Sequence, residues 1–320
     1  LGSNARLGQG KLLVAEADES DGSFLMLSPT IAVVTNIDPE HLDHFGTVEN
    51  VEQAFVDFIN RVPFYGRAIL CLDHPRVRAL LPYVRKPYVT YGTSSDADWI
   101  ASDVSVEGLT THFDVRHGDT HFGRVSLQIP GRHYALNALA AAIAAGEVGV
   151  PFATVREALA EFGGIHRRFE VLGEVGNILV VDDYGHHPEE IRATLRAARE
   201  GFDRRLVVAF QPHRYSRTRD LFADFLTAFD DAEKLFLTEV YAAGELPIEG
   251  MSGEALYQAL RKRGHLDVDF RATRAALGAA VLDALRPGDL LVVLGAGDIY
   301  KVGEDVMQTL RVRGSGLRVV

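Results

Sequence analysis

The sequence predicts an α/β protein with two domains, the second of them doubly wound. Short apolar runs of strand length alternate with amphipathic segments of helical length through most of the 320 residues. Residues 99–129 instead alternate apolar and polar side chains, which is typical of an antiparallel ribbon. After residue 168, strands near residues 178, 206, 235, 268 and 290 are separated by helical segments. We therefore place a domain boundary near residue 168.

The residues before this ribbon predict a parallel α/β layer, and those after it predict helices. Continuous apolar runs indicate buried strands at residues 11–17 (KLLVAEA), 31–37 (IAVVTNI) and 67–72 (RAILCL). Apolar residues at helical spacing predict helices at residues 48–62 and 75–84. An alanine-rich helix pair is expected at residues 134–149 and 152–162.

The composition excludes several classes of function. A formal net charge of −11 argues against a general nucleic-acid binder, because binding of phosphates needs a basic surface. Cys71 is the only cysteine, so a disulfide framework and a cysteine metal site are excluded and a reducing cytoplasm fits. The apolar runs are too short to cross a bilayer, and no signal-peptide pattern opens the chain. We therefore expect a cytoplasmic protein with neither nucleic-acid nor membrane partners.

Ionisable side chains crowd into residues 180–191 (VVDDYGHHPEEI). The β-branched run from Ile178 to Val181 predicts a strand, and Pro188 with the acids after it predicts a first helical turn. The cluster then lies on a strand-to-helix loop, where open α/β sheets bind ligands. The alternative is an exposed polar turn that is rich in aspartate and histidine.

Acidic residues also follow the predicted strands at residues 11–17 and 31–37. The first strand ends in Glu16, Asp18, Glu19 and Asp21, and the second is followed by Asp38, Glu40 and Asp43 together with His41 and His44. Carboxylate oxygens at neighbouring strand ends suit Mg²⁺, which binds one or two protein carboxylates together with phosphates. The alternatives are a solvated acidic loop and a capped helix start.

Three further stretches carry groups suited to anions or to packing. His133 and Asn137 stand four residues apart at a helix start, so both can face one pocket, although this spacing alone favours a capping or packing role. Arg167 and Arg168 suit either a phosphate or a surface salt bridge. The predicted strand at residues 205–210 is followed by a basic group that suits an anionic substrate, namely His213, Arg214, Arg217 and Arg219.

Taken in order, these stretches resemble the Mur ligases over essentially the whole chain. The resemblance rests on VAEADESDGSFL, VVTNIDPEHLD, ALNALAAA, HRRFE, VDDYGHHPEEI and FQPHRYSRTRDLF. Within that family, DDYGHHP with FQPHRYSRT is similar to the member that adds alanine. The resemblance implies ATP-dependent ligation of L-alanine to the carboxylate of UDP-N-acetylmuramate through an acyl phosphate, with Mg²⁺, in peptidoglycan precursor synthesis. It implies a monomer or weak homodimer.

The resemblance also implies roles for individual residues. Glu16 and His41 would bind Mg²⁺, with Asp18 and Glu19 as neighbours. The nucleotide would be held by His133, Tyr134, Asn137, Arg168 and Asp183. The muramate and alanine site would be lined by Tyr184, His186, His213, Arg214 and Arg217. The groups assigned to catalysis are Arg168, His186, Arg214 and Arg217.

The domains implied by the resemblance are a central ATP-binding domain at residues 1–168 and a Rossmann-like C-terminal domain at residues 169–320. The family's Gly-Lys-Ser/Thr phosphate loop is not found, because Gly10-Lys11 is followed by Leu12. The first domain is therefore expected to be truncated at its N-terminus, in a fragment that also lacks the UDP-binding domain and is inactive alone. Tyr134 replaces an asparagine that is usual in the family, so stacking on adenine is one possible contact there.

Two other functions remain open from the residues alone. A metal-dependent phosphohydrolase would use the same acids and histidines to activate water, and it would turn over without an amino acid. A binding-only fragment would retain affinity for substrate or product without catalysis.

Overall fold

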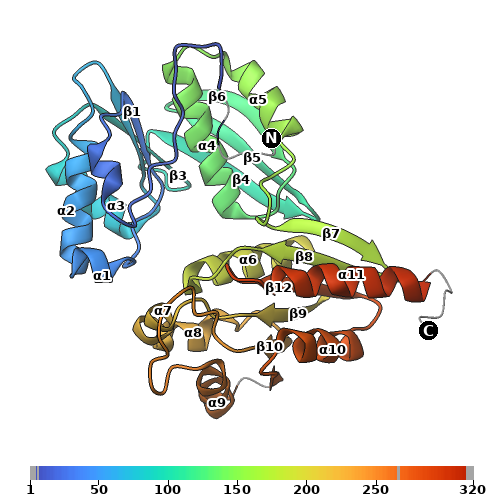
Figure 1. Cartoon of the computed structure of the whole chain (residues 1–320). Coiled ribbons are helices and arrows are strands. Elements are labelled where there is room, and N and C mark those ends of the chain that lie inside the picture. The colour runs from blue at the N-terminus through green and yellow to red at the C-terminus, as the bar shows by residue number, and fades with distance from the viewer. Residues whose placement is uncertain (1–4, 6, 265–266, 315–320) are drawn as a thin grey trace. The chain divides into compact units, whose positions relative to one another are not determined.

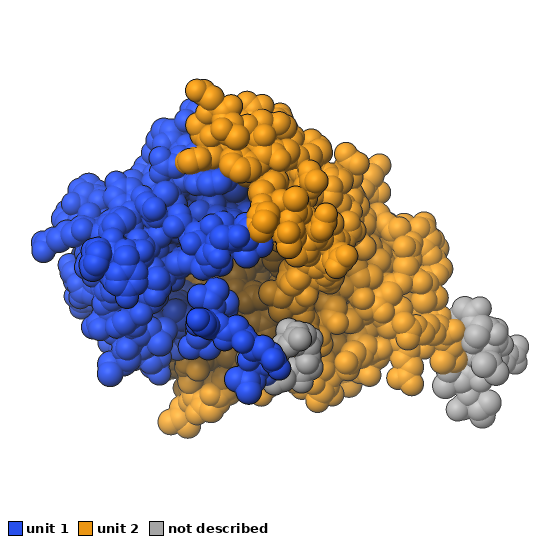
Figure 2. Space-filling view, turned by 90° about the horizontal axis from the view of Figure 1, so that it is seen from above, with its two compact units in different colours: residues 1–100, 139–150 blue, residues 101–138, 151–320 orange. Residues whose placement is uncertain are grey.

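The computed structural model describes residues 5, 7–264 and 267–314. The chain forms two compact units, which are coloured separately in Figure 2 and are described here one at a time. Unit 1 comprises residues 1–100 and 139–150, and unit 2 comprises residues 101–138 and 151–320. This division does not fall at residue 168, so the boundary near that residue stays a prediction.

Unit 1 is built on three parallel strands that pair in chain order, as the sequence predicts for two of them. The strands are β1 (Ile31–Val34), β2 (Arg67–Cys71) and β3 (Tyr88–Gly92). Its helices are η1 (Ser23–Met26), α1 (Leu42–Phe45), α2 (Val48–Ile59), α3 (Pro75–Leu80) and η2 (Leu81–Tyr83). Thr47 caps α2 by accepting a hydrogen bond from the amide of Asn50 at 3.3 Å. The apolar face of α2 packs on the strands through Val51, Val56 and Ile59.

The ribbon predicted at residues 99–129 is confirmed. It consists of β4 (Trp99–Glu107), β5 (Thr110–His117) and β6 (Thr120–Leu127), and β5 pairs with β6 in antiparallel register. The first residues of β4 pair with β3, and the division between the units falls within β4. Two predicted helices follow the ribbon, α4 (Arg132–Glu147) and α5 (Phe152–Glu161). The described helices include none with both the length and the apolar character needed to cross a bilayer.

Unit 2 contains a second sheet of six strands in the order β11-β10-β9-β12-β8-β7. All neighbours are parallel except β7, which pairs antiparallel with β8 at the edge. The strands are β7 (Glu170–Val175), β8 (Ile178–Asp183), β9 (Arg205–Phe210), β10 (Lys234–Leu237), β11 (Val268–Phe270) and β12 (Asp289–Leu294). The helices are α6 (Pro188–Gly201), α7 (Tyr215–Asp220), α8 (Phe222–Ala228), α9 (Gly253–Arg263), α10 (Arg274–Ala284) and α11 (Tyr300–Gly314). The doubly wound α/β prediction is confirmed.

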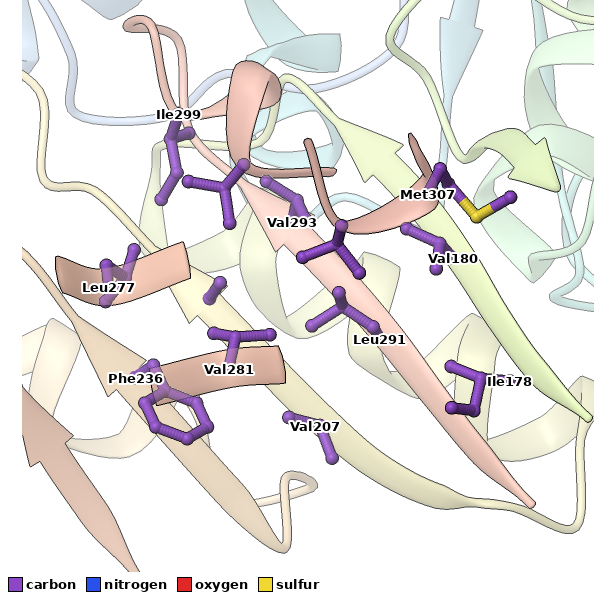
Figure 3. Packing of buried hydrophobic residues seen from close by; sticks show 13 residues of the cluster. Ile178, Val180, Val207, Phe236, Leu277, Val281, Leu291, Val293, Ile299 and Met307 are labelled. Atoms are coloured by element: carbon purple, nitrogen blue, oxygen red, sulfur yellow. The ribbon is translucent and has the colours of Figure 1, made fainter. Parts of the chain in front are cut away.

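Helices cover both faces of this sheet, which explains why its central strands are continuous apolar runs. Helices α10 and α11 pack together on one face, while α8 lies between α6 and α9 on the other (Figure 1). Figure 3 shows the first face, where Val180 and Val293 point toward the same side as Val281 of α10 and Met307 of α11. Burying these side chains stabilises the sheet and holds the strand ends in place.

The strand predicted at residues 11–17 is wrong. Residues 11–17 form no strand, and Leu12, Leu13 and Val14 are 67%, 90% and 94% exposed. A strand needs a neighbour to pair with its backbone, and no described strand pairs with this segment. The sequence analysis also misses β3 and β7, which are short strands that end or bend at glycine.

Candidate functional site

Titratable side chains gather in unit 2 where β8 and β9 end. Most of them come from the loops that follow these two strands, and two come from the start of α4. Three residues near this cluster have left-handed backbone conformations although none is glycine: Arg167 (φ 59°) and Phe169 (φ 47°) just before β7, and Arg214 (φ 67°) after β9. Such conformations cost free energy and concentrate at functional sites.

Asp183, the last residue of β8, is buried, and backbone amides hold its carboxylate. The amide of Gly185 donates to Oδ1 at 2.7 Å, and that of Phe169 donates to Oδ2 at 2.8 Å. A Cβ on residue 185 would lie 2.8 Å from Oδ1, so glycine permits this approach. Burial raises the pKa of Asp183 to about 6, although the two amides and Arg168 oppose the rise. The carboxylate is therefore fixed in position before any ligand binds.

Glu190 links the two halves of the cluster, and the sequence analysis did not assign it a role at the site. Its Oε1 accepts from Arg168 Nη1 at 3.2 Å, and its Oε2 accepts from the amides of His186 at 2.9 Å and His187 at 3.1 Å. Burial alone would raise the pKa of Glu190, but His186 and Arg168 hold that pKa below its ordinary value. The available signal was its place three residues after His187, which caps α6 in a capping box.

Arg168 is half-buried beside two acids. Burial lowers the pKa of its guanidinium, but Glu190 and Asp183 together raise that pKa by more than burial lowers it. The group therefore stays charged. The guanidinium also lies 5.5 Å from the ring centre of Tyr184. A phosphate that approaches Arg168 therefore meets a positive group whose position is already set.

Arg167 has a different environment from its neighbour. Its Nε donates to Asp182 Oδ2 at 2.9 Å, and its Nη2 donates to the carbonyl of Gly295 at 2.6 Å. Its guanidinium lies 5.1 Å from the ring centre of Tyr184 and 4.8 Å from that of Tyr300. These contacts tie the end of β8 to the end of β12, so Arg167 is a structural residue in this arrangement.

The start of α4 places two aromatic rings at the site. The centroids of His133 and Tyr134 lie 4.1 Å apart. Burial, with a contribution from Arg168, lowers the pKa of His133 to about 4, so its ring is neutral at pH 7. Burial and Asp183 raise the pKa of the Tyr134 phenol. Asn137, the third predicted residue on this helix, is exposed.

Two neutral imidazoles lie side by side next to these groups. The ring centroids of His186 and His213 are 5.7 Å apart. Burial is the main cause that lowers the pKa of each to about 4. His186 Nδ1 lies 3.1 Å from the carbonyl of Tyr184, which only accepts, so the proton is on Nδ1 and Nε2 carries the lone pair.

His213 adopts the opposite tautomer. Arg217 Nη1 lies 3.3 Å from His213 Nδ1 and can only donate, so Nδ1 accepts and the proton is on Nε2. Arg214, which follows His213 and precedes the first residue of α7, is exposed. The structure thus brings together one imidazole that accepts, one that donates, and two arginines.

Unit 1 contains one described group with the donor atoms of a metal site. Ligand atoms of Glu19, Glu40 and His41 all lie within 4.8 Å of one another. His41 has a left-handed backbone (φ 56°) at the start of α1. Glu16, the other predicted ligand, is exposed and is not part of this group, and Asp18 Oδ1 accepts from the amide of Ser20 at 2.8 Å. The assignment of Glu16 and His41 to Mg²⁺ stays a prediction.

Comparison with known proteins shows which family this chain belongs to. Residues 6–145 match the model of the Mur ligase middle domain, and residues 167–297 match the model of the Mur ligase, glutamate ligase domain. The UDP-N-acetylmuramate--L-alanine ligase of Anaeromyxobacter sp. (strain Fw109-5) is 57% identical over 309 residues, which are 97% of this chain and 67% of that protein. The chain belongs to the Mur ligase family.

Other Mur ligases agree with this assignment. The protein of the same name from Myxococcus xanthus (strain DK1622) is 55% identical over 97% of this chain and 66% of its own length. The crystal structure of UDP-N-acetylmuramate-alanine ligase MurC from Thermotoga maritima aligns with a TM-score of 0.75 and 26% identity, over 93% of this chain and 63% of that one. The chain thus spans about two thirds of the length of its Mur ligase relatives, and the predicted family resemblance is confirmed.

Proposed function

We propose that this Mur ligase joins the amino group of L-alanine to the carboxylate of UDP-N-acetylmuramate, with cleavage of ATP to ADP and phosphate, in peptidoglycan precursor synthesis. The observation that carries the proposal is the cluster in unit 2, where Arg168, Asp183 and Glu190 adjoin the His186 and His213 pair. Relatives at 55–57% identity bear the name of this ligase. The group around Arg168 and Asp183 suits a nucleotide. The pair of His186 and His213 suits an amino acid that binds beside an anion.

The reaction must activate a carboxylate before an amine can attack it. A carboxylate oxygen of the muramate attacks the γ-phosphorus of ATP, the bond to the ADP oxygen breaks, and an acyl phosphate forms. The neutral amine of alanine then attacks the acyl carbon. The tetrahedral intermediate expels phosphate, and the nitrogen loses a proton. Charge collects on the phosphoryl group in both steps, which explains the need for arginines.

Several residues of unit 2 are suited to bind the nucleotide. We assign Arg168 to the nucleotide phosphates and the rings of His133 and Tyr134 to the adenine. The two oxygens of Asp183 each accept one amide and retain lone pairs for the ribose hydroxyls. Asn137 is exposed and free to turn toward the same nucleotide.

The histidine pair suits the two ends of an amino acid. We assign His186 Nε2, which carries a lone pair, to the amino group of alanine, and the proton on His213 Nε2 to its carboxylate. Their low pKa values keep both imidazoles neutral at pH 7, so neither repels the ammonium form of alanine as it binds and loses the proton that frees its amine to attack. Arg214 and Arg217 would then bind the phosphorylated carboxylate, beside Tyr184.

The donor set of unit 1 fits Mg²⁺. Two carboxylates and one imidazole, from Glu19, Glu40 and His41, lie close enough to share one ion, and carboxylate oxygens are hard ligands. When bound, Mg²⁺ neutralises charge on the phosphates of ATP. These three residues would hold it, and Glu16 remains a candidate by resemblance.

An assay of ADP and product separates this proposal from its rivals. We would supply Mg²⁺-ATP and UDP-N-acetylmuramate with and without L-alanine, to the 320-residue chain and to a version completed with the segments of the Anaeromyxobacter relative that the chain does not span. The proposal expects ADP release that requires alanine, with UDP-N-acetylmuramoyl-L-alanine as product. Because the 320 residues contain no Gly-Lys-Ser/Thr phosphate loop, we expect the chain alone to turn over little. Alanine-independent release of phosphate would identify a hydrolase instead.

A further inference from the structure

Arg214 has a backbone conformation that needs support. Its φ of 67° and ψ of 137° lie in a region that is almost restricted to glycine. A side chain persists there only where surrounding contacts hold the backbone in place. Arg214 belongs to a basic segment, residues 213–217, that runs from the loop after β9 into the first turn of α7 and also carries His213 and Arg217; we call it the basic loop. The contacts that hold this loop come from the segment after β10, residues 241–245, which we call the supporting segment.

Tyr241 contacts the basic loop through both its backbone and its ring. Its carbonyl accepts from the amide of Arg214 at 2.8 Å, and its own amide donates to the carbonyl of Pro212 at 2.8 Å. Its ring stacks on that of His213, with centroids 5.5 Å apart and planes 9° apart. One residue therefore fixes the strained backbone of Arg214 and the plane of the His213 imidazole.

Glu245 holds the other end of the same loop. Its Oε2 accepts from the amide of Ser216 at 3.0 Å, and its Oε1 accepts from the hydroxyl of Ser216 at 2.6 Å. Ser216 immediately precedes Arg217. Hydrogen bonds to a carboxylate are stronger than neutral ones, so this pair anchors the start of α7 on the supporting segment.

A glycine beneath Tyr241 allows its ring to reach His213. A Cβ on residue 297 would lie 2.7 Å from Tyr241 Cγ and 2.5 Å from Gln211 Oε1. Contacts this short do not occur, so any side chain at Gly297 would displace the ring. The turn after β12 thus contributes to the support of the loop after β9.

We propose that Tyr241 and Glu245 are positioning residues, which act by holding His213, Arg214 and Arg217 in the arrangement that binds the substrate anion. The inference rests on the proposed function for the identity of that anion. The supporting segment itself offers no base or nucleophile to the reaction in this account. Its effect should therefore pass through the three basic residues.

Steady-state kinetics of the completed protein test the role of Tyr241. Removing the ring in Tyr241→Ala should raise the KM for UDP-N-acetylmuramate or alanine about 5- to 10-fold, the expected value of one aromatic stack, with a smaller change in kcat. Tyr241→Phe keeps the stack and the backbone contacts and should restore most of the loss. Tyr257→Ala is a matched control, because Tyr257 stacks on Phe270, 6.0 Å away, in the α9 region.

Double variants test whether the effect passes through the basic loop. Adding Tyr241→Ala to His213→Ala should cost less than about twofold in kcat/KM, because the imidazole that the Tyr241 ring positions is already gone. Ser216→Ala should cost less than Glu245→Ala, because the amide of residue 216 still donates to Glu245, and the combination should cost no more than Glu245→Ala alone. Fully multiplicative losses would assign both residues a merely structural role.

An NMR titration of the 320-residue chain needs no substrate and keeps the two proposals apart. Burial lowers the pKa of His213 to about 4, and loss of the Tyr241 ring should let it rise toward 6.5, while Tyr257→Ala leaves it unchanged. A shifted His213 pKa in this chain, together with no ligase activity in the completed protein, would refute the proposed function and leave the positioning role standing. Normal ligation with an unshifted His213 pKa in Tyr241→Ala would overturn the positioning role.

Discussion

Residues 11–17 and β8 have the same sequence pattern and different structures. Each is an apolar run that ends in acids, KLLVAEADE in the first and ILVVDD in the second. All six residues of β8 are buried, and β8 pairs with β12 on one side and β7 on the other. Residues 11–17 pair with no described strand, and Val14 is 94% exposed. An apolar run thus becomes a strand only where the fold supplies neighbours.

The difference extends to the acids that follow each run. Asp183 is held by two backbone amides and lies at a fixed distance from its neighbours. Glu16 is exposed, and the acid close to His41 is Glu19 instead. A strand end therefore prepares a site in unit 2, whereas in unit 1 the ligands come from loops. Four measurements on variants of the two regions test this difference.

Matched substitutions in the two runs should differ most. Val181→Asp places an unpaired carboxylate among buried side chains and should lower the free energy of unfolding by about 4 kcal/mol or more. Val14→Asp changes an exposed residue and should stay within about 0.5 kcal/mol of the wild type. Urea denaturation of the two variants measures both values. Equal losses would mean that residues 11–17 are buried as β8 is.

Acid should destabilise the chain through the histidines of the unit 2 cluster. The folded pKa values of His133, His186 and His213 are about 4, below the ordinary 6.5, so the unfolded chain binds more protons as the pH falls from 6.5 toward 4. Asp183 opposes this, because its folded pKa of about 6 lies above the ordinary 3.8 and the folded chain binds that proton.

The histidines outnumber the aspartate, so the net effect of lowering the pH from 7 to 5.5 should be a loss of about 1–3 kcal/mol. Urea denaturation at the two pH values gives the difference, and His186→Asn should reduce it. Stability that rises over this interval would show that the imidazoles are already protonated in the folded chain.

The fixed carboxylate at the end of β8 provides the third comparison. Asp183→Asn replaces one acceptor oxygen by a donor that faces an amide, and it should cost about 1–2 kcal/mol of stability. Glu16→Gln should cost nothing measurable in the absence of metal. Thermal unfolding of both variants without Mg²⁺ checks this, and a neutral Asp183→Asn would contradict the preorganised carboxylate.

Measurements of metal affinity show which acids of unit 1 are metal ligands. Glu19→Gln and His41→Asn should each weaken binding of Mn²⁺, a spectroscopic substitute for Mg²⁺, by about tenfold, because each removes a ligand. Glu16→Gln should bind as the wild type does if the ligand set is that of the described structure. Paramagnetic resonance titrations give these affinities, and a larger loss in Glu16→Gln than in Glu19→Gln would restore the assignment made by resemblance.

The sequence was sufficient for elements whose neighbours lie next to them in the same domain. All five strands predicted after residue 168 occur, and Pro188 begins α6 as expected. β7 was missed because an edge strand needs only one apolar face, and Gly173 interrupts its register. Residues 11–17 were wrongly predicted to form a strand, because an apolar run in the sequence does not show whether a partner strand exists.

The sequence predicted which residue types form the site, but it predicted less well which of those residues contact one another. Asp183, His186 and His213 were expected at strand ends, where the structure has them, and Arg168 was expected at the domain boundary and lies just before β7. Glu190 was read only as a helix-start acid, because a capping box has the same pattern whether or not its glutamate also binds an arginine. Tyr241 left no local signal, since its contacts with His213 and Arg214 join residues 28 and 27 positions apart in the chain.

Hydrogen exchange of the ligand-free 320-residue chain tests the central comparison most directly. The account predicts strong protection of the Phe169 and Gly185 amides, which donate to the buried Asp183, and exchange at nearly unprotected rates for the amides of residues 12–16. Protection of residues 12–16 equal to that of β8 would show that they pair as a strand. Rapid exchange at Phe169 and Gly185 would show that the carboxylate at the end of β8 is not held in advance, which contradicts the account.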